Sequence, residues 1–138
     1  MRKIIVFIAI FGLSGCTFNL FSSPPPVYVV FFPDHSTDLT GDGKKIVDDV
    51  ASTAKMSGTK MIEIAGPETK VAPGYDPSFA QARIHTVEAT LVADGIDAKR
   101  LVHTSLTTGD LNVKADPSGA QRVELRLIDQ PANGSPAT

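Results

Sequence analysis

The chain has 138 residues, which suits one domain with a single hydrophobic core and is too short for two comfortable ones. Its 13 Lys and Arg nearly balance 15 Asp and Glu, and no basic run interleaved with aromatic residues occurs, so nucleic acid is a poor candidate partner. Cys16 is the only cysteine, which excludes a disulfide within the chain and leaves buried apolar surface to hold the fold.

Residues 1–15 have the layout of a secretory signal peptide. Arg2 and Lys3 precede an apolar run over 4–13, and the small residues Ser14 and Gly15 follow. The run is about half as long as the roughly 20 residues that a membrane-spanning helix needs. We therefore expect export and cleavage rather than a permanent membrane span.

The segment Leu-Ser-Gly-Cys that ends at Cys16 resembles the lipobox of bacterial lipoproteins. This resemblance implies cleavage before Cys16, attachment of a diacylglyceryl group and further acyl chains such as palmitate, and an anchor in a membrane that faces the periplasm. Thr17 stands where an aspartate would resemble the inner-membrane retention signal, so the analogy favours the outer membrane.

Proline-rich and turn-forming segments flank the predicted domain, which we place at 27–129. Residues 16–26 are predicted to be the lipidated N-terminus and a linker, because the three prolines at 24–26 favour an extended polyproline spacer. Residues 130–138 lack apolar periodicity and are rich in turn formers, so we expect a disordered tail.

The first half of the domain predicts a strand, a helix and a second strand. The β-branched and aromatic run 27–32 lies between two prolines and is typical of a strand. Thr40 can cap a helix that extends to about Met56, and Gly58 can end it. The alternation over 60–65 predicts the second strand. The expected buried positions in this half are Ile46, Val47, Val50, Ala51, Ala54, Met61, Ile62 and Ile64.

A loop and a second helix follow. The loop covers 66–75 and leads to Asp76, a good N-cap residue, and to Pro77, a residue favoured at the first helical position. Apolar residues at helical spacing continue to Gly95, which suits the left-handed residue that closes many helices. The apolar positions of this helix are Phe79, Ile84, Val87, Leu91 and Val92.

Two further strands, over 100–106 and 122–128, complete a βαβαββ order. Apolar and polar residues alternate in the last strand, in the order Val123, Glu124, Leu125, Arg126 and Leu127. Each helix has one apolar stripe that must be buried, which predicts a two-layer α+β sandwich with both helices packed on one face of a mixed sheet. The sequence alone does not decide which strands are neighbours.

A set of residues between about 29 and 127 follows a known family pattern. They are Phe32, Ser36, Leu39, Thr40, Ile62 to Gly66, Tyr75, Asp76, Phe79, Ala80, Arg83, Ile84, Val87, Leu91, Val92, Gly95, Ile96, Arg100, Leu101 and Arg122 to Glu124. Together they resemble the OmpA-like C-terminal domain, the peptidoglycan-binding module also found in the Pal lipoproteins. The stretch from Tyr75 to Ile96 matches without a gap and is the specific part of the resemblance.

The resemblance implies a site for the peptide stem of peptidoglycan. Family members hold diaminopimelate, whose free end carries an ammonium and a carboxylate side by side. An arginine on the second helix takes the carboxylate in a bidentate, charge-assisted pair, and Arg83 falls on that position. The alternative is a surface arginine in a helical salt bridge, although none of its neighbours one turn away is acidic.

The acidic partner departs from the family pattern. The family motif Gly-His-Thr-Asp stands here as Gly66-Pro67-Glu68-Thr69, so either Glu68 or Thr69 falls on the position of the aspartate that takes the ammonium. Asp76 replaces a family asparagine and is a further candidate. Glu68 is also explained as a solvated loop carboxylate, and Asp76 as a helix N-cap.

Two functions remain open. The first is a membrane-anchored lipoprotein whose domain binds peptidoglycan non-covalently and tethers the envelope to the cell wall. The second is a degenerate OmpA-like scaffold that serves as a structural or interaction subunit among envelope proteins or in a secretion assembly. We do not expect an enzyme, because His35, His85 and His103 match no zinc spacing and no Gly-x-Ser-x-Gly segment is present. No cofactor or metal is implied.

Overall fold

The computed structural model describes residues 24–58, 60–67, 75–106 and 120–129. The predicted signal peptide 1–15, the lipidation site Cys16, the loop residues Glu68 and Thr69, and the tail 130–138 lie outside these described residues. Within the described ranges, no helix is both long enough and apolar enough to cross a membrane.

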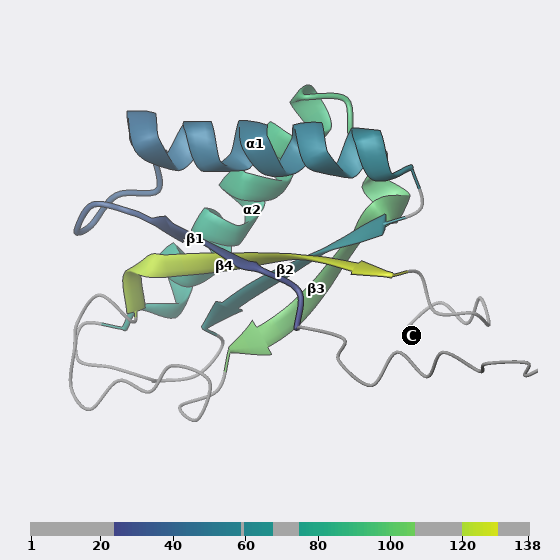
Figure 1. Cartoon of the computed structure of the whole chain (residues 1–138). Coiled ribbons are helices and arrows are strands. Elements are labelled where there is room, and N and C mark those ends of the chain that lie inside the picture. The colour runs from purple at the N-terminus through teal and green to yellow at the C-terminus, as the bar shows by residue number, and fades with distance from the viewer. Residues whose placement is uncertain (1–23, 59, 68–74, 107–119, 130–138) are drawn as a thin grey trace, which may run out of the picture.

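Within the described residues, four strands form one sheet in the order β1-β4-β2-β3 (Figure 1). The strands are β1 (Val27–Phe31), β2 (Lys60–Pro67), β3 (Leu101–Leu106) and β4 (Arg122–Asp129). β4 lies antiparallel between β1 and β2, whereas β2 and β3 are parallel. The predicted βαβαββ order and mixed sheet are confirmed. The strand pairing, which the sequence left open, places the last strand between the first two.

The two predicted helices begin at the predicted caps. α1 (Gly41–Ser57) starts where the hydroxyl of Thr40 accepts a hydrogen bond from an amide in its first turn, at 3.0 Å. α2 (Pro77–Ala93) starts where Asp76 accepts the amide of Ser78 at 2.8 Å. Each cap satisfies an amide that the first helical turn leaves without a partner. Gly95 closes α2 with a φ of +90°, as predicted.

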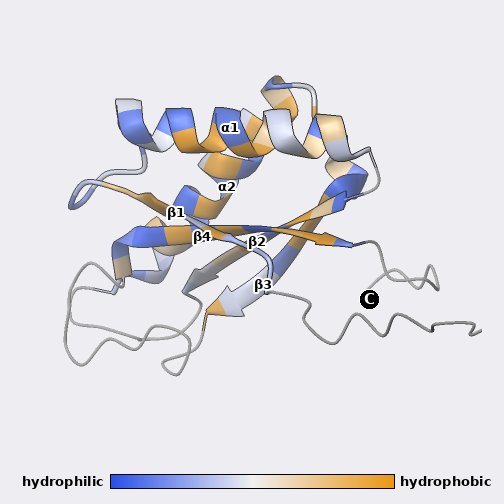
Figure 2. Ribbon diagram, in the orientation of Figure 1, coloured by the Kyte–Doolittle hydropathy of each residue, from blue (hydrophilic) through white to orange (hydrophobic). Residues whose placement is uncertain are grey.

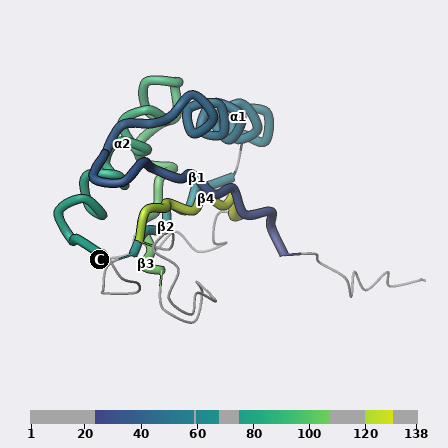
Figure 3. The backbone as a smooth tube through the Cα atoms, turned by 90° about the vertical axis from the view of Figure 1, so that its left-hand side faces the viewer, coloured from purple at the N-terminus to yellow at the C-terminus, as the bar shows by residue number. Residues whose placement is uncertain are grey.

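Both helices cover the same face of the sheet, as expected (Figure 3). Their apolar stripes face the apolar side of the strands (Figure 2). Fully buried side chains at this interface include Val30, Val47, Val50, Ile62, Ile64, Val87, Leu91, Val123 and Leu125. Each such side chain stabilises the fold by about 1.5–3 kcal/mol relative to an exposed one, so this layer supplies the core that a chain without disulfides requires.

Some residues of the predicted apolar stripes are not fully buried, and among them Ile46 and Phe79 are half-buried. Met61 is half-buried, because alternation along β2 directs it to the face opposite its neighbour Ile62. Val92 is 44% exposed, because it lies about 100° around α2 from the buried Leu91. The remaining predicted apolar positions of α1, β2 and α2 are buried, so these differences leave the orientation of the elements unchanged.

The face of the sheet away from the helices carries a ladder of charged side chains. Glu124 of β4 is 5% exposed, and its carboxylate lies 2.7 Å from Arg122 Nη2 and 3.0 Å from Arg126 Nη2. Glu63 of β2 lies 3.6 Å from Arg126 and accepts the hydroxyl of Thr104 at 2.9 Å. The predicted polar side of the last strand is confirmed, and the cost of burying Glu124 is offset by two guanidinium groups.

Candidate functional site

Arg83, the centre of the predicted site, is buried in the second turn of α2 with 4% of its surface exposed. Its Nε donates to the carbonyl of Ser36 at 2.8 Å, its Nη1 to that of Ala120 at 3.1 Å, and its Nη2 to that of Pro33 at 3.1 Å. These carbonyls belong to the segment after β1 and to the residue two positions before β4. Arg83 therefore joins three separate parts of the chain at one end of the sheet.

Two phenylalanine rings flank the guanidinium of Arg83. The guanidinium carbon lies 5.6 Å from the centre of the Phe32 ring and 5.4 Å from that of Phe79, distances at which a cation is attracted to an aromatic face. Phe79 precedes Arg83 by four residues, so α2 places both on one face. The rings shield the guanidinium from water, so its N–H groups interact with acceptors in a medium of low dielectric constant.

Arg83 makes no ion pair of 4.0 Å or less with any carboxylate of the described residues. The alternative of a helical surface salt bridge therefore fails within that part of the chain. Burial lowers the pKa of Arg83 below its ordinary value, while the charges of Asp34 and Asp76 act in the opposite direction. A guanidinium carries five N–H donors, and three of them are bonded to carbonyls of the described residues, which leaves two without an acceptor in that part of the chain.

Asp76 is brought close to Arg83 and also caps α2. Its Oδ1 accepts the amide of Ser78 at 2.8 Å and the hydroxyl of the same residue at 2.6 Å. These bonds lower the pKa of Asp76, so it is ionised at neutral pH. The predicted N-cap role is confirmed, and the negative charge of the same carboxylate acts on the guanidinium of Arg83.

Asp34 is a second acidic group at this end of the sheet, and the sequence analysis did not identify it. Its Oδ1 accepts the side-chain amide of Gln121 at 3.0 Å and the backbone amide of His35 at 3.1 Å. A signal was present, because the segment after the first strand and the start of the second helix are expected at the same end of a βαβ unit. The proposed roles of Glu68 and Thr69 stay predictions, since both lie outside the described residues.

The end of β2 packs unusually close to α2 beside this site. A side-chain carbon added at Gly66 would lie 2.4 Å from Cδ1 and 2.6 Å from Cγ1 of Ile84, which is far inside van der Waals contact. β2 also runs two residues further than predicted, through Gly66 and Pro67, which pair with β3. The absence of a side chain at Gly66 thus brings the first turns of α2 onto the sheet.

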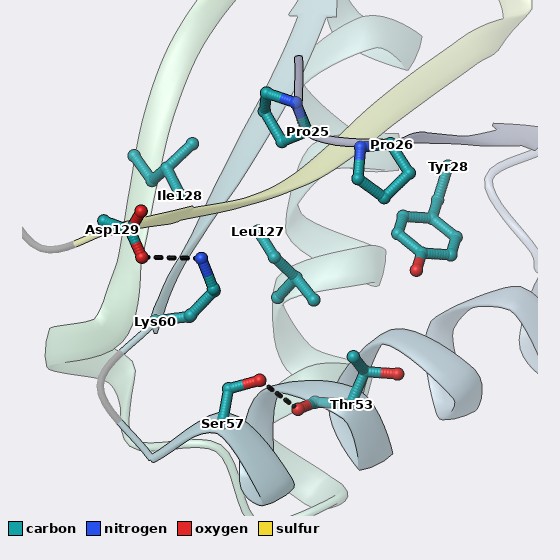
Figure 4. Close-up of a pocket in the computed structure, with 9 residues that line it drawn as sticks. All are labelled: Pro25, Pro26, Tyr28, Thr53, Ser57, Lys60, Leu127, Ile128 and Asp129. Atoms are coloured by element: carbon teal, nitrogen blue, oxygen red, sulfur yellow. Dashed lines mark hydrogen bonds and ion pairs between the residues drawn. The ribbon is translucent and has the colours of Figure 1, made fainter. Parts of the chain in front are cut away.

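A separate hollow of about 490 Å³ lies at the opposite end of the sheet (Figure 4). It is lined by Pro25, Pro26, Tyr28, Thr53, Ser57, Lys60, Leu127, Ile128 and Asp129. Lys60 and Asp129 form an ion pair with each other, and the hydroxyl of Ser57 donates to the carbonyl of Thr53 at 2.9 Å. The charged groups of the hollow are thus already paired, which distinguishes it from the surroundings of Arg83.

The histidines do not form a recognisable metal centre. His85 and His103 each lie 3.7 Å from the carboxylate of Glu88 on the surface. Within the described ranges, no group of three or more His, Cys, Asp or Glu side chains is arranged to hold a metal ion.

The sheet order, the two helices on one face and the βαβαββ connectivity define the fold of OmpA-like domains. Similar solved structures include the OmpA-like domain of FopA1 from Francisella tularensis, with a TM-score of 0.59 and 18% identity over 76% of this chain and 75% of that one. The peptidoglycan-associated lipoprotein from Burkholderia pseudomallei gives 0.55 and 20% over 75% and 90% of the two chains. The periplasmic domain of MotB from Helicobacter pylori gives 0.54 and 17% over 74% and 71%. No family model and no curated protein matches the sequence.

Proposed function

We propose that this chain is an OmpA-like lipoprotein, anchored in the outer membrane through Cys16, whose domain faces the periplasm and binds the diaminopimelate of the peptidoglycan stem peptide. Binding is non-covalent and tethers the envelope to the cell wall. One observation carries the proposal: Arg83 is a buried cation that lacks an ionic partner among the described residues. The fold, which is shared with a peptidoglycan-associated lipoprotein, supports it.

The unused donors of Arg83 match the carboxylate of the ligand. Within the described residues, one N–H on Nη1 and one on Nη2 remain after the bonds to Ala120 and Pro33, and these two can hold both oxygens of a carboxylate. Burying a cation is costly unless a charge of opposite sign accompanies it. A bound carboxylate supplies that charge, and the rings of Phe32 and Phe79 strengthen the pair by keeping water out.

The ammonium of diaminopimelate lies next to its carboxylate, so its partner must be an acidic group near Arg83. Asp34 and Asp76 meet this condition, since the charge of each acts on the guanidinium. Glu68 remains a third candidate from the sequence. Because a positive guanidinium and negative carboxylates lie near one another, a zwitterionic ligand is favoured over a simple anion, which the carboxylates would repel.

The test is retention of the full chain, extracted in detergent, on purified peptidoglycan of the diaminopimelate type. The informative pair of variants is Arg83→Lys and Arg100→Lys. Arg100 also donates to backbone carbonyls, those of Lys60 and Ala54, but at the opposite end of the sheet. We expect Arg83→Lys to lower retention at least tenfold and Arg100→Lys to leave it unchanged, because lysine cannot form the bidentate pair. Failure of the native chain to bind would overturn the proposal.

The acidic half of the site is tested by neutralising one carboxylate at a time. Asp34→Asn and Asp76→Asn each keep a similar shape and remove one charge. Asp49→Asn is the control, since Asp49 is exposed on α1, where it pairs with Lys45 at 3.5 Å. Weaker retention with Asp34→Asn or Asp76→Asn alone identifies the partner of the ammonium. Unchanged retention with both would direct attention to Glu68.

The second candidate, an envelope scaffold without a peptidoglycan ligand, is favoured by a different aspect of Arg83. Three of its donors already satisfy backbone carbonyls, which is what a purely structural arginine does. This hypothesis predicts that the native chain is not retained on peptidoglycan and that Arg83→Lys changes only stability. The retention assay therefore separates the two functions.

A further inference from the structure

β1 offers a free backbone edge on one side of the sheet. It is the end strand of the sheet order and pairs only with β4 among the described residues. Phe32 donates its amide to the carbonyl of Gln121 at 2.8 Å, in the register of the β1–β4 ladder. Hydrogen bonding alternates along an antiparallel pair, so the N–H and C=O groups of Val27, Val29 and Phe31 point away from β4.

This edge lacks the charges that usually protect an edge strand. All five residues of β1 are apolar or aromatic, and Val27 and Phe31 are 44% and 49% exposed. The other edge strand, β3, follows Arg100 and carries His103, whose side chain is 51% exposed. Exposed, uncharged edges tend to pair with a further strand. Among the described elements, no strand follows β1 on that side of the sheet (Figure 1).

We propose that two copies of this chain pair antiparallel through their β1 edges, about a twofold axis at Val29. In that register Val29 of one copy faces Val29 of the other. Val27 of each copy faces Phe31 of the other copy. Each of these pairs exchanges two N–H···O bonds between residues whose groups already point outward. The four-stranded sheet of one copy then continues into that of the other.

A second copy fits this edge because the strand complements itself. The twofold axis brings the exposed Val27 of one copy against the exposed Phe31 of the other, and an aromatic residue opposite a β-branched one is a favourable cross-strand pair. No charge of the strand opposes another. Pro26 and Pro33 bound the edge, so the pairing is limited to β1.

The proposal does not depend on the ligand site. Arg83 lies beyond the C-terminal end of β1, so antiparallel pairing keeps the two Arg83 sites apart. An edge of five residues buries much less than the roughly 800 Å² per partner of a stable complex, so we expect a weak dimer that forms at high local concentration. A covalent trap is the suitable assay.

The experiment is disulfide trapping in the full chain with Cys16→Ser, so that each introduced cysteine is the only thiol. In an antiparallel pair, directly opposed residues that exchange hydrogen bonds have Cα atoms about 5.5 Å apart, which a disulfide can bridge. We expect Val29→Cys to give cross-linked dimer under mild oxidation at least fivefold faster than Val102→Cys, a control on the outer strand β3.

The register is checked with a mixture of two chains. Val27→Cys mixed with Phe31→Cys should give a cross-linked heterodimer, whereas each variant alone should cross-link little. Both side chains are exposed, so neither change disturbs the core. The proposal is overturned if Val29→Cys cross-links no faster than Val102→Cys, or if the mixture cross-links no better than its components. A chain that stays monomeric while another protein occupies the edge would give that result.

Discussion

Arg83 and Arg100 use their guanidinium groups in the same way at opposite ends of the sheet. Each donates to backbone carbonyls of segments that are far apart in sequence. They differ in what surrounds them, because Arg83 is almost fully buried between two aromatic rings and lies near Asp34 and Asp76. The same side chain thus holds the local structure and is the proposed contact for the ligand, so stability and binding must be measured separately.

The structural role of Arg83 predicts a loss of stability on truncation. Arg83→Ala leaves the carbonyls of Pro33, Ser36 and Ala120 without their donor, and we expect the free energy of unfolding to fall by about 2–4 kcal/mol. The free energy of unfolding of Arg83→Lys should lie between those of Arg83→Ala and the native protein, because one ammonium cannot reach all three carbonyls. Urea unfolding measures both. A native-like midpoint for Arg83→Ala would show that these hydrogen bonds do not hold the site together.

The cap at Asp76 predicts a pH-dependent contribution to stability. Hydrogen bonds from Ser78 lower the pKa of Asp76 below its ordinary value of 3.8. A carboxyl whose pKa is lowered by folding stabilises the protein above its unfolded pKa, and this contribution is lost as the pH falls through the folded pKa. Asp76→Ala should therefore unfold at a lower temperature than the native protein at pH 7, and the difference should shrink below about pH 4.

The control for this titration is Thr40→Ala, which removes the cap of α1. The hydroxyl of Thr40 accepts an amide hydrogen bond but does not ionise in this range. Its effect on the melting temperature should be similar at both pH values. If the change in melting temperature caused by Asp76→Ala is also the same at both pH values, the charge of Asp76 does not contribute to stability.

At the level of elements, the contact between β2 and α2 depends on Gly66. Gly66→Ala would place a carbon 2.4 Å from the end of the buried Ile84 side chain, and we expect a loss of about 1–3 kcal/mol from overpacking. Ile84→Ala removes both clashing atoms, so the double variant should recover much of the loss caused at Gly66. Denaturant unfolding of all four combinations gives the coupling energy.

The matched control is Gly41→Ala at the start of α1, where an added side-chain carbon meets no atom within 4 Å. It should change stability little. A coupling energy near zero between Gly66 and Ile84 would mean that α2 shifts freely, and that glycine is not what sets the position of the helix.

The parts of the fold that follow from local sequence were predicted correctly. Thr40 and Asp76 mark the helix starts because capping requires only a few neighbouring residues. The insertion of β4 between β1 and β2 was not predictable from one sequence, since it depends on contacts between distant segments. The same holds for the site: the resemblance identified Arg83, but only the folded chain shows that its donors reach the segment after β1, where Asp34 lies.

For the molecule as a whole, β1 runs from one end of the sheet to the other, and different features lie at its two ends. The chain enters at Pro25 and Pro26, beside the hollow of Figure 4, whereas Arg83 contacts the segment that leaves β1 at its other end. Pro25 and Pro26 and the surroundings of Arg83 therefore lie at opposite ends of the sheet. This arrangement would suit the proposed tether, because the proposed ligand site lies at the end of the sheet away from Pro25 and Pro26.

A tether requires both of its ends, and separate variants should disable them independently. Cys16→Ser removes the acceptor of the lipid, so the protein should move from the membrane fraction to the soluble periplasmic fraction while its affinity for peptidoglycan is unchanged. Arg83→Lys should stay in the membrane fraction and lose co-sedimentation with peptidoglycan. Cell fractionation followed by peptidoglycan sedimentation measures both properties in one preparation. Retention in the membrane fraction of a Cys16→Ser chain that has lost residues 1–15 would contradict the lipid anchor, because such a chain would be held there without the thiol and without the apolar leader.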